Sequence, residues 1–145
     1  MTDIILVHPD GTREVKKINI DKSYDSKEFK DLINEHKAYN VMMYFDVKEK
    51  DAFKFIIKYS SDEKLQINQY TNLFVSQHPT NKPPFTRDLK LYTGVLIVIK
   101  VINPGKGGYV INDLNEKIIN CSVDDFNRLY DHYYKKSQAS TCVIL

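Results

Sequence analysis

The stretch that decides the fold is Leu89–Ile102, LKLYTGVLIVIKVI, the longest apolar run of the chain. Valine, isoleucine and tyrosine dominate it, and β-branched residues pack better on a pleated sheet than in a helix. Asn103-Pro104-Gly105 follows the run and ends any regular element. The run therefore predicts a strand. A buried helix is the alternative reading, which Gly94 and the many β-branched residues disfavour.

Both faces of this predicted strand are apolar. One face holds Leu89, Leu91, Val95, Ile97, Ile99 and Val101, and the other holds Leu96, Val98 and Ile102. A strand with apolar residues on both faces is typical of the centre of a sheet that is covered on both sides. We therefore expect Ile97 and Ile99 to be buried in the core.

Other alternating apolar segments predict further strands around this one. They span residues 3–8, 13–20, 39–47, 53–59, 109–111 and 117–121. Short turns join several of them. In Pro9-Asp10-Gly11-Thr12, for example, the Asp-Gly pair favours a tight hairpin. The apolar phase slips between Val15 and Ile18, which predicts a β-bulge in the second strand. The short connections indicate a mainly antiparallel sheet.

Two segments have the periodicity of amphipathic helices. In the first, Asp25 is expected to cap the helix and Glu28 to complete a capping box. In the second, Ser122 and Asp125 have the same spacing. The expected apolar faces are Phe29, Leu32, Ile33 and His36 in the first helix and Phe126, Leu129, Tyr130 and Tyr133 in the second. Leu65–Val75 fits either a strand or a helix.

These elements predict an α+β fold, with two amphipathic helices packed on a mainly antiparallel sheet. Each helix follows a predicted hairpin, so the chain is read as two hairpin-helix units, related either by duplication or by chance. We expect one domain over residues 1–136, with a subdomain break at the Pro-rich segment 76–86, and a C-terminal tail over residues 137–145.

Composition and charge limit the partners and the cellular location that we expect for the protein. The chain has 145 residues and a net charge of +2 from 21 basic and 19 acidic residues, so we expect no nucleic-acid partner. Two cysteines imply no disulfide framework, and neither a signal peptide nor a membrane-spanning run is present, which predicts an intracellular, cytoplasmic location. Abundant Lys, Ile, Asn and Tyr are typical of an A+T-rich genome, such as that of a protist or a large DNA virus.

The last four residues are Cys142-Val143-Ile144-Leu145. They resemble the CaaX box of prenylated proteins, in which a cysteine is followed by two aliphatic residues and a residue that selects the isoprenoid. The resemblance implies that Cys142 is lipidated, and Leu145 at the last position implies geranylgeranyl. The alternative is an apolar end, Val143, Ile144 and Leu145, that fits a partner's groove. The neighbouring Lys135 and Lys136 are the basic residues that would assist a lipid.

Other candidates for chemistry are weaker. Gly105-Lys106-Gly107-Gly108 lacks the Ser or Thr and the helix of a phosphate loop, so a plain turn is expected. The four histidines, His8, His36, His78 and His132, have no ligand spacing, so we expect neither a metal nor a cofactor. Cys121 is expected in the core, and Tyr134 is the aromatic interface candidate.

We see no acid–base or nucleophile constellation, so we do not expect an enzyme. The sequence favours a binding or adaptor module that a prenylated Cys142 attaches to a membrane. The alternative is a structural component of a larger assembly, such as a virion, with an ordered C-terminal tail. The identity of the protein partner is left open.

Overall fold

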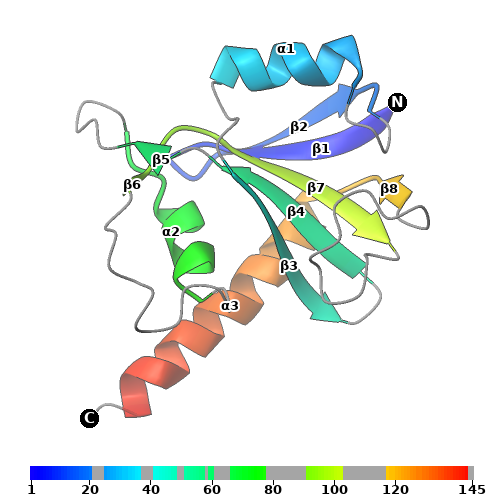
Figure 1. Ribbon diagram of the computed structural model, residues 1–145. Helices are drawn as coiled ribbons and strands as arrows, with labels where there is room; N and C mark the ends of the chain where they lie inside the picture. The colour runs from blue at the N-terminus through cyan, green and yellow to red at the C-terminus, as the bar shows by residue number, and fades with distance from the viewer. Residues whose placement is uncertain are drawn as a thin grey trace.

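The computed structural model describes residues 1–20, 25–36, 41–48, 51–57, 59–60, 66–77, 91–102 and 117–143. Within these stretches the protein has an α+β fold, with antiparallel strands in one large sheet and helices on both of its faces (Figure 1). The fold class predicted from the sequence is confirmed.

The main sheet has six strands, five of them in the order β2-β1-β7-β4-β3, with β8 also paired to β7. Their bounds are β1 Thr2–Val7, β2 Arg13–Ile18, β3 Val41–Lys48, β4 Asp51–Ile57, β7 Leu96–Ile102 and β8 Lys117–Ile119. β1 pairs with the first half of β7 and β8 with its second half, while β4 lies along the other side. β7 is therefore the central strand, as predicted.

The two faces of β7 enter two separate cores. Ile97 and Ile99 are fully buried on one side and Leu96 and Val98 on the other, which confirms the predicted pattern. The first core, here called the α1-side core, comprises Ile4, Leu6, Ile18, Ile20, Phe29, Leu32, Ile97, Ile99 and Val101. The second, the α3-side core, comprises Ile5, Val7, Phe53, Phe74, Val75, Leu96, Val98, Cys121, Phe126, Leu129 and Tyr133.

The apolar run of residues 89–102 is divided into two strands instead of forming one. Leu91–Tyr92 is β6, which pairs with β5 (Tyr59–Ser60) in a separate two-stranded sheet. Between β6 and β7, Gly94 has φ +72°, a conformation that breaks a strand and that glycine adopts without steric penalty. The chain therefore bends at Gly94, and the run contributes one strand to each of two sheets.

The β1–β2 hairpin is regular. Gly11 has φ +96° in the turn, and the amide of Thr12 donates to Asp10 Oδ1 at 2.9 Å. The predicted bulge in the second strand is wrong, because every residue of β2 pairs in register with β1. The phase slip has a simpler cause: Ile18 lies in the α1-side core, whereas Val15 points to the other face and remains 47% exposed.

The first helix, α1, spans Lys27–His36 and buries Phe29 and Leu32 in the α1-side core, as predicted. Ile33 packs against this core and His36 is partly buried. The spacing of these residues explains the helix, because i, i+3 and i+4 positions share one face.

The cap predicted for α1 is wrong by one residue. Ser26, and not Asp25, caps the helix, since Ser26 Oγ accepts from the amide of Phe29 at 3.2 Å. Glu28 does not close a capping box either: its carboxylate accepts from the amide of Asn19 at 2.7 Å and so ties the helix to the end of the preceding hairpin.

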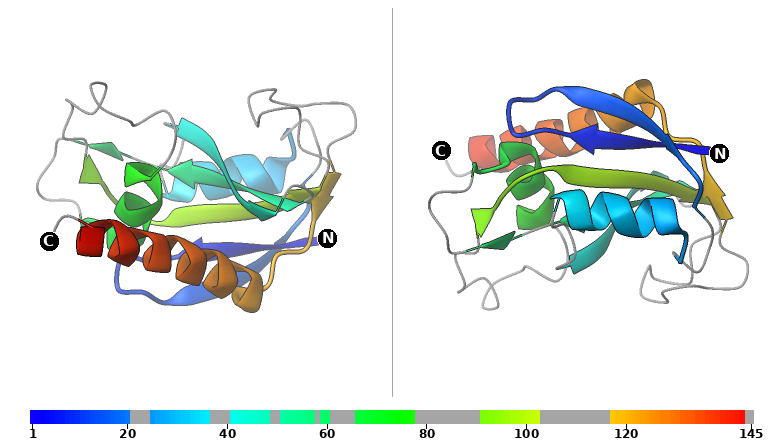
Figure 2. Two further views of the ribbon diagram at one scale, coloured as in Figure 1. Left: turned by 90° about the horizontal axis from the view of Figure 1, so that it is seen from below. Right: turned by 90° about the horizontal axis from the view of Figure 1, so that it is seen from above.

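The ambiguous segment contains a third helix, α2, which spans Gln69–Ser76. The helical spacing of Tyr70, Leu73 and Phe74 was the informative signal, and the expectation of only two helices is corrected. The N-cap of α2 is Asn68, whose side-chain oxygen accepts from the amides of Tyr70 and Thr71. Figure 2 shows α2 beside α3 on the same face of the sheet.

The last helix, α3, spans Val123–Val143 and is longer than predicted. Its apolar face is as expected, with Phe126 and Leu129 fully buried and Tyr133 almost so. The helix does not end at Lys136, where a polar tail was expected, but continues through residues 137–143. Its C-terminal half extends beyond the sheet (Figure 1).

α1 and α3 cover opposite faces of the same sheet (Figures 1 and 2). The suggestion of two related hairpin-helix units gains no support from the caps, because the cap of α1 is shifted by one residue relative to that of α3. β8 pairs with β7, and the strand predicted at 109–111 lies outside the described residues, as does most of the Pro-rich segment 76–86.

Candidate functional site

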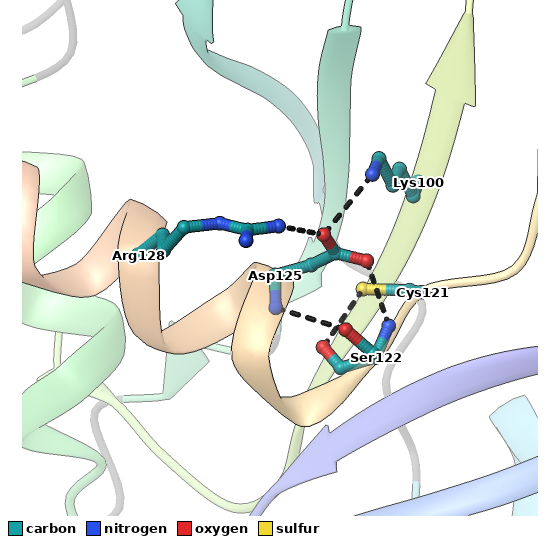
Figure 3. A network of polar contacts seen from close by, with 5 residues as sticks. All are labelled: Lys100, Cys121, Ser122, Asp125 and Arg128. Carbon is teal, nitrogen blue, oxygen red and sulfur yellow. Dashed lines mark hydrogen bonds and ion pairs between the residues drawn. The ribbon is translucent and has the colours of Figure 1, made fainter.

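A polar network surrounds the N-terminus of α3 (Figure 3). Ser122 and Asp125 form the predicted capping box: the amide of Asp125 donates to Ser122 Oγ at 3.0 Å, and the amide of Ser122 donates to Asp125 Oδ2 at 2.9 Å. Two amides that have no partner inside the helix are thereby satisfied. This arrangement fixes where α3 begins.

Asp125 also binds two cations. Lys100 Nζ lies 3.1 Å from Asp125 Oδ1, and Arg128 donates to the same oxygen. The side chains of Lys100 and Asp125 are only 15% and 11% exposed. Lys100 is the one charged residue of β7, and its ammonium also lies 6.0 Å from the Phe53 ring centroid. The pair joins the central strand to α3.

Burial raises the pKa of Asp125, but the amide of Ser122 and the Lys100 ammonium more than offset this, so the pKa lies below the ordinary value of 3.8. Asp125 is therefore a carboxylate at neutral pH. Because its oxygens are occupied by the cap and by two cations, the network as it stands is suited to holding structure together.

Cys121 is next to this network but is not a nucleophile. It is fully buried, and burial together with the negative charge of Asp125 raises the pKa of its thiol to about 12. The thiol is then protonated at physiological pH, and only a thiolate attacks or ligates. Its placement in the α3-side core agrees with the sequence prediction.

A second cluster lies where β2, α2 and α3 meet. The guanidinium of Arg13 lies over three rings, with its carbon 5.0 Å from the Tyr70 centroid, 5.4 Å from Phe126 and 5.8 Å from Tyr130. Arg13 also donates to the carbonyl of Gly11 and, through Nε, to Asn127 Oδ1 at 3.1 Å. These contacts pin the edge strand β2 to α3.

The Arg13 cluster continues to the surface through tyrosines. Tyr70 and Tyr130 have ring centroids 5.4 Å apart, and Tyr134 stacks on Tyr130 at 5.9 Å. Burial and the neighbouring Tyr70 and Tyr134 raise the pKa of Tyr130. Tyr134 itself is 46% exposed, and an exposed tyrosine on a rigid aromatic base suits a contact surface.

The structure describes only part of the C-terminal segment Cys142–Leu145 that resembles a CaaX box. The backbone of Cys142 and Val143 belongs to the last turn of α3, whereas Ile144 and Leu145 lie outside the described residues. Lys135 and Lys136, one and a half turns or more before Cys142, are exposed. The backbone of Cys142 and Val143 thus lies at the far end of a helix whose other end is fixed to the sheet.

The remaining candidates are scattered. His8 Nε2 lies 3.0 Å from Glu14, His36 ends α1, and the ring of His132 meets Tyr133 edge-on at 5.4 Å. His78 and the glycine-rich segment 105–108 lie outside the described residues. In the part of the chain that the structure describes, no three His, Cys, Asp or Glu side chains come close enough to hold a metal ion, and no helix is long and apolar enough to cross a membrane.

Three important residues were missed in the sequence. Lys100 could have been predicted to form a buried ion pair, because a lone lysine in an apolar strand needs a partner of opposite charge. Asn68 could have been predicted to cap a helix, since asparagine is a preferred N-cap. The role of Arg13 could not have been predicted, because its partner Asn127 is 114 positions away in the chain.

Comparisons with protein-family models, with curated proteins and with solved structures find no match to this chain. Its function is therefore argued from its own residues.

Proposed function

We propose that this protein is a non-enzymatic binding module that is held at a membrane by a geranylgeranyl group on Cys142. The observation that carries the proposal is the sequence Cys142-Val143-Ile144-Leu145, which resembles a CaaX box. A CaaX box is modified only at the C-terminus of a protein, so the intact mass of the native protein also tests whether Leu145 is its last residue.

The proposed modification is a thioether. Cys142 Sγ forms a bond to the first carbon of geranylgeranyl diphosphate, the bond from that carbon to the diphosphate oxygen breaks, and the thiol proton passes to solvent. A transferase that reads four residues requires an extended peptide, so the last turn of α3 has to unwind. Cys142 is nine positions beyond Tyr133, the last buried residue among those described in α3. Unwinding there leaves the core of the domain untouched.

The surroundings of the motif support this reading. The spacer from Ser137 to Thr141 is small and polar. As a helix, the nine residues from Tyr133 to Cys142 span about 14 Å, so Cys142 lies about that far along α3 from its last buried residue among those described. A single isoprenoid binds membranes only marginally, so a second attraction is needed, and Lys135 and Lys136 are exposed nearby. The exposed Tyr134 is the residue best placed to meet a partner.

The experiment compares the wild type with Cys142→Ser in a eukaryotic cell. We expect the wild type in the membrane fraction and Cys142→Ser in the soluble fraction. Intact mass should show the added isoprenoid and the loss of the three terminal residues. Thr141→Ser, which leaves the motif intact, is the matched control, and Leu145→Ser should exchange geranylgeranyl for the shorter farnesyl group. Equal membrane association of wild type and Cys142→Ser, or an unmodified mass, contradicts the proposal.

One observation favours a second function, a structural component of a larger assembly such as a virion. α3 is helical through Val143, so the apolar end of the chain is carried on a helix that extends beyond the sheet (Figure 1). A helix end of this kind suits a groove on a neighbouring subunit. In that case Cys142→Ser has little effect, and loss of Val143, Ile144 and Leu145 prevents assembly.

A further inference from the structure

The strand β2 lies at one end of the main sheet. It is the first strand in the order β2-β1-β7-β4-β3, and β1 is its one neighbour among the described residues. It contributes no residue to the α3-side core, and Val15, near its middle, is 47% exposed. Within the part of the chain that the structure describes, the outer edge of β2 is therefore open. An edge of this kind can pair with another strand through its free backbone groups.

The hydrogen bonds of the hairpin show which backbone groups face this open edge. The amide of His8 donates to the carbonyl of Thr12 at 2.9 Å, so these two residues form a hydrogen-bonded pair. Such pairs alternate along an antiparallel ladder, so positions 14, 16 and 18 also exchange their backbone bonds with β1. The positions between them point their amides and carbonyls to the open edge. They are Arg13, Val15 and Lys17.

Contacts at the far end of the hairpin agree with this alternation. The amide of Asn19, the next odd-numbered position, donates to Glu28 of α1 and not to β1. On β1, the amide of Asp3 donates to Asn120 and its carbonyl accepts from Cys121. Both residues follow β8, which pairs with β7, so these bonds lie on the side of β1 away from β2.

The charges of β2 favour one register for pairing with the β2 strand of a second copy. Two identical antiparallel strands are related by a two-fold axis. With Val15 on the axis, Glu14 of each copy lies opposite Lys16 of the other in a non-hydrogen-bonded pair, where side chains approach most closely. An axis at Glu14 would instead oppose two glutamates, and an axis at Lys16 two lysines, which is unfavourable. Lysines often protect an edge strand from pairing, but in the first register each Lys16 meets a carboxylate.

The pair of like charges in this register is compensated within each copy. Arg13 lies opposite Lys17 of the second copy. The guanidinium of Arg13, however, is directed to the Tyr70 ring, 5.0 Å away, and Lys17 Nζ lies 3.3 Å from Asp3 Oδ1 of its own chain. Neither cation therefore has to approach the other. The two Val15 side chains add an apolar contact at the axis.

We infer that two copies of this protein associate through β2, with Val15 on the two-fold axis, and form one continuous sheet. Each of the pairs Arg13–Lys17, Val15–Val15 and Lys17–Arg13 exchanges two backbone hydrogen bonds. The axis is perpendicular to the sheet, so both α3 helices lie on one face and both α1 helices on the other (Figure 2). A single pair of strands is a small interface, below about 1,200 Å², so the dimer is expected to be weak and concentration-dependent.

The first test reverses the charges in the 145-residue chain made in bacteria, where no isoprenoid is added. Sedimentation into the millimolar range should show a monomer–dimer equilibrium. Glu14→Lys or Lys16→Glu alone should weaken dimerisation by roughly tenfold, because two symmetry-related pairs change from attraction to repulsion. A mixture of the two variants should recover the wild-type affinity, since opposite charges then face each other again. The matched controls, Glu35→Lys and Lys27→Glu, make the same charge changes at exposed positions of α1 and should dimerise like the wild type.

The second test removes a backbone donor from the open edge. Val15→Pro has no amide at the axis, but the ladder to β1 remains, because the amide at position 15 points outward and proline is tolerated at such positions. We expect Val15→Pro to be monomeric with the circular dichroism spectrum of the wild type. Val15→Ala, which keeps the amide, should retain the dimer.

The third test reports the register. In a Cys142→Ser background, Val15→Cys places two thiols opposite each other with α-carbons about 5.5 Å apart, within the reach of a disulfide. Lys17→Cys, on the same face, separates its two thiols by four positions, about 13 Å, which is too far. In a buffer of oxidised and reduced glutathione, Val15→Cys and not Lys17→Cys should form a linked dimer. Cys121 is buried and does not interfere.

Three outcomes overturn the inference. They are a wild type that is monomeric at every concentration, a dimer that the β2 charge reversals weaken no more than the α1 controls do, and equal cross-linking at positions 15 and 17. None of these measurements depends on a lipid at Cys142, whose presence the intact mass decides separately. The dimer and the proposed function can therefore fail independently.

Discussion

A single amide side chain, that of Asn68, joins three elements of this fold. It is fully buried, and its nitrogen donates to the carbonyls of Val7 at 3.0 Å and Gly94 at 2.9 Å. Its oxygen accepts from two amides in the first turn of α2, those of Tyr70 and Thr71. The end of β1, the bend before β7 and the start of α2 are thus fixed by one residue. Few side chains offer two donors and one acceptor in this geometry.

We therefore predict that substitution of Asn68 lowers the free energy of unfolding more than substitution of most other polar residues. Asn68→Ala should lower the free energy of unfolding by about 2–4 kcal/mol, because buried carbonyls and amides lose their partners. Asn68→Asp keeps the two bonds of the helix cap but places a carboxylate against two carbonyl oxygens, so at pH 7 it should be at least as destabilising. Urea denaturation measures both, with Asn72→Ala as the control. A loss below about 0.5 kcal/mol for Asn68→Ala contradicts the role assigned here.

Asp125 gives a prediction that depends on pH. Its pKa lies below 3.8, because the Ser122 amide and Lys100 outweigh the effect of burial. A carboxyl whose pKa is lowered on folding stabilises the protein above its unfolded pKa, and this contribution is lost as the pH falls through the folded pKa. Asp125→Asn should therefore be destabilising by about 1–3 kcal/mol at pH 7. The difference from the wild type should shrink below about pH 4.

Denaturation of both proteins at a series of pH values measures this difference. Ser122→Ala, which removes one bond of the cap and keeps the carboxylate, should cost about 1 kcal/mol. A gap between wild type and Asp125→Asn that is constant with pH would mean that the charge of Asp125 contributes nothing.

At the scale of elements, the central strand β7 gives the clearest test of where the core lies. Ile97 contributes to the α1-side core, and its neighbours Leu96 and Val98 contribute to the α3-side core. Ile97→Ala should cost about 2–5 kcal/mol and Ile97→Val about 0.5–1.5 kcal/mol, since the cavity scales with the atoms removed. Val15→Ala, at a half-exposed position of β2, should change stability by less than about 0.5 kcal/mol. Similar effects at Ile97 and Val15 in reversible denaturation would show that β7 is not the core.

Elements with a strong local signal were predicted correctly. The apolar residues on both sides of β7 and the Ser122–Asp125 cap of α3 are readable because each depends on neighbours within a few positions. α1 was also predicted, but its cap was assigned to Asp25 and is Ser26, because two residues in succession that can both cap a helix give no local basis for choosing between them.

What the sequence did not reveal depends on contacts between distant segments. The pairing of β7 with both β1 and β4 needs strands far apart in the chain. The bend at Gly94 is visible only when β6 joins a second sheet. Periodicity alone likewise does not show which cation will bind Asp125 or which rings will surround Arg13.

At the scale of the whole molecule, one sheet separates two cores, and each core is closed by different helices. α1 closes one side, and α2 with α3 closes the other (Figure 2). All buried residues described in α3 lie between Phe126 and Tyr133, so the part of the helix beyond Tyr133 adds length more than it adds core. Changes after Tyr133 are therefore expected to affect what the end of α3 binds without lowering the stability of the domain.

The last prediction uses this expectation to decide between a lipid anchor and an assembly contact. Ending the chain at Cys142 removes Val143, Ile144 and Leu145 and so destroys the CaaX box while keeping the cysteine. If the end serves lipidation, this truncated protein should be soluble in cells, as Cys142→Ser is. Its free energy of unfolding should differ from that of the unmodified wild type by less than about 0.5 kcal/mol.

If the end is instead an assembly contact, the two variants diverge. The truncated protein then loses its oligomers in sedimentation, because an apolar helix end no longer fills its groove, while Cys142→Ser keeps them. Because the buried residues of α3 precede the deletion, a change in oligomeric state without a change in monomer stability can be assigned to the missing end itself. Parallel behaviour of the two variants supports the lipid, and divergent behaviour supports the assembly.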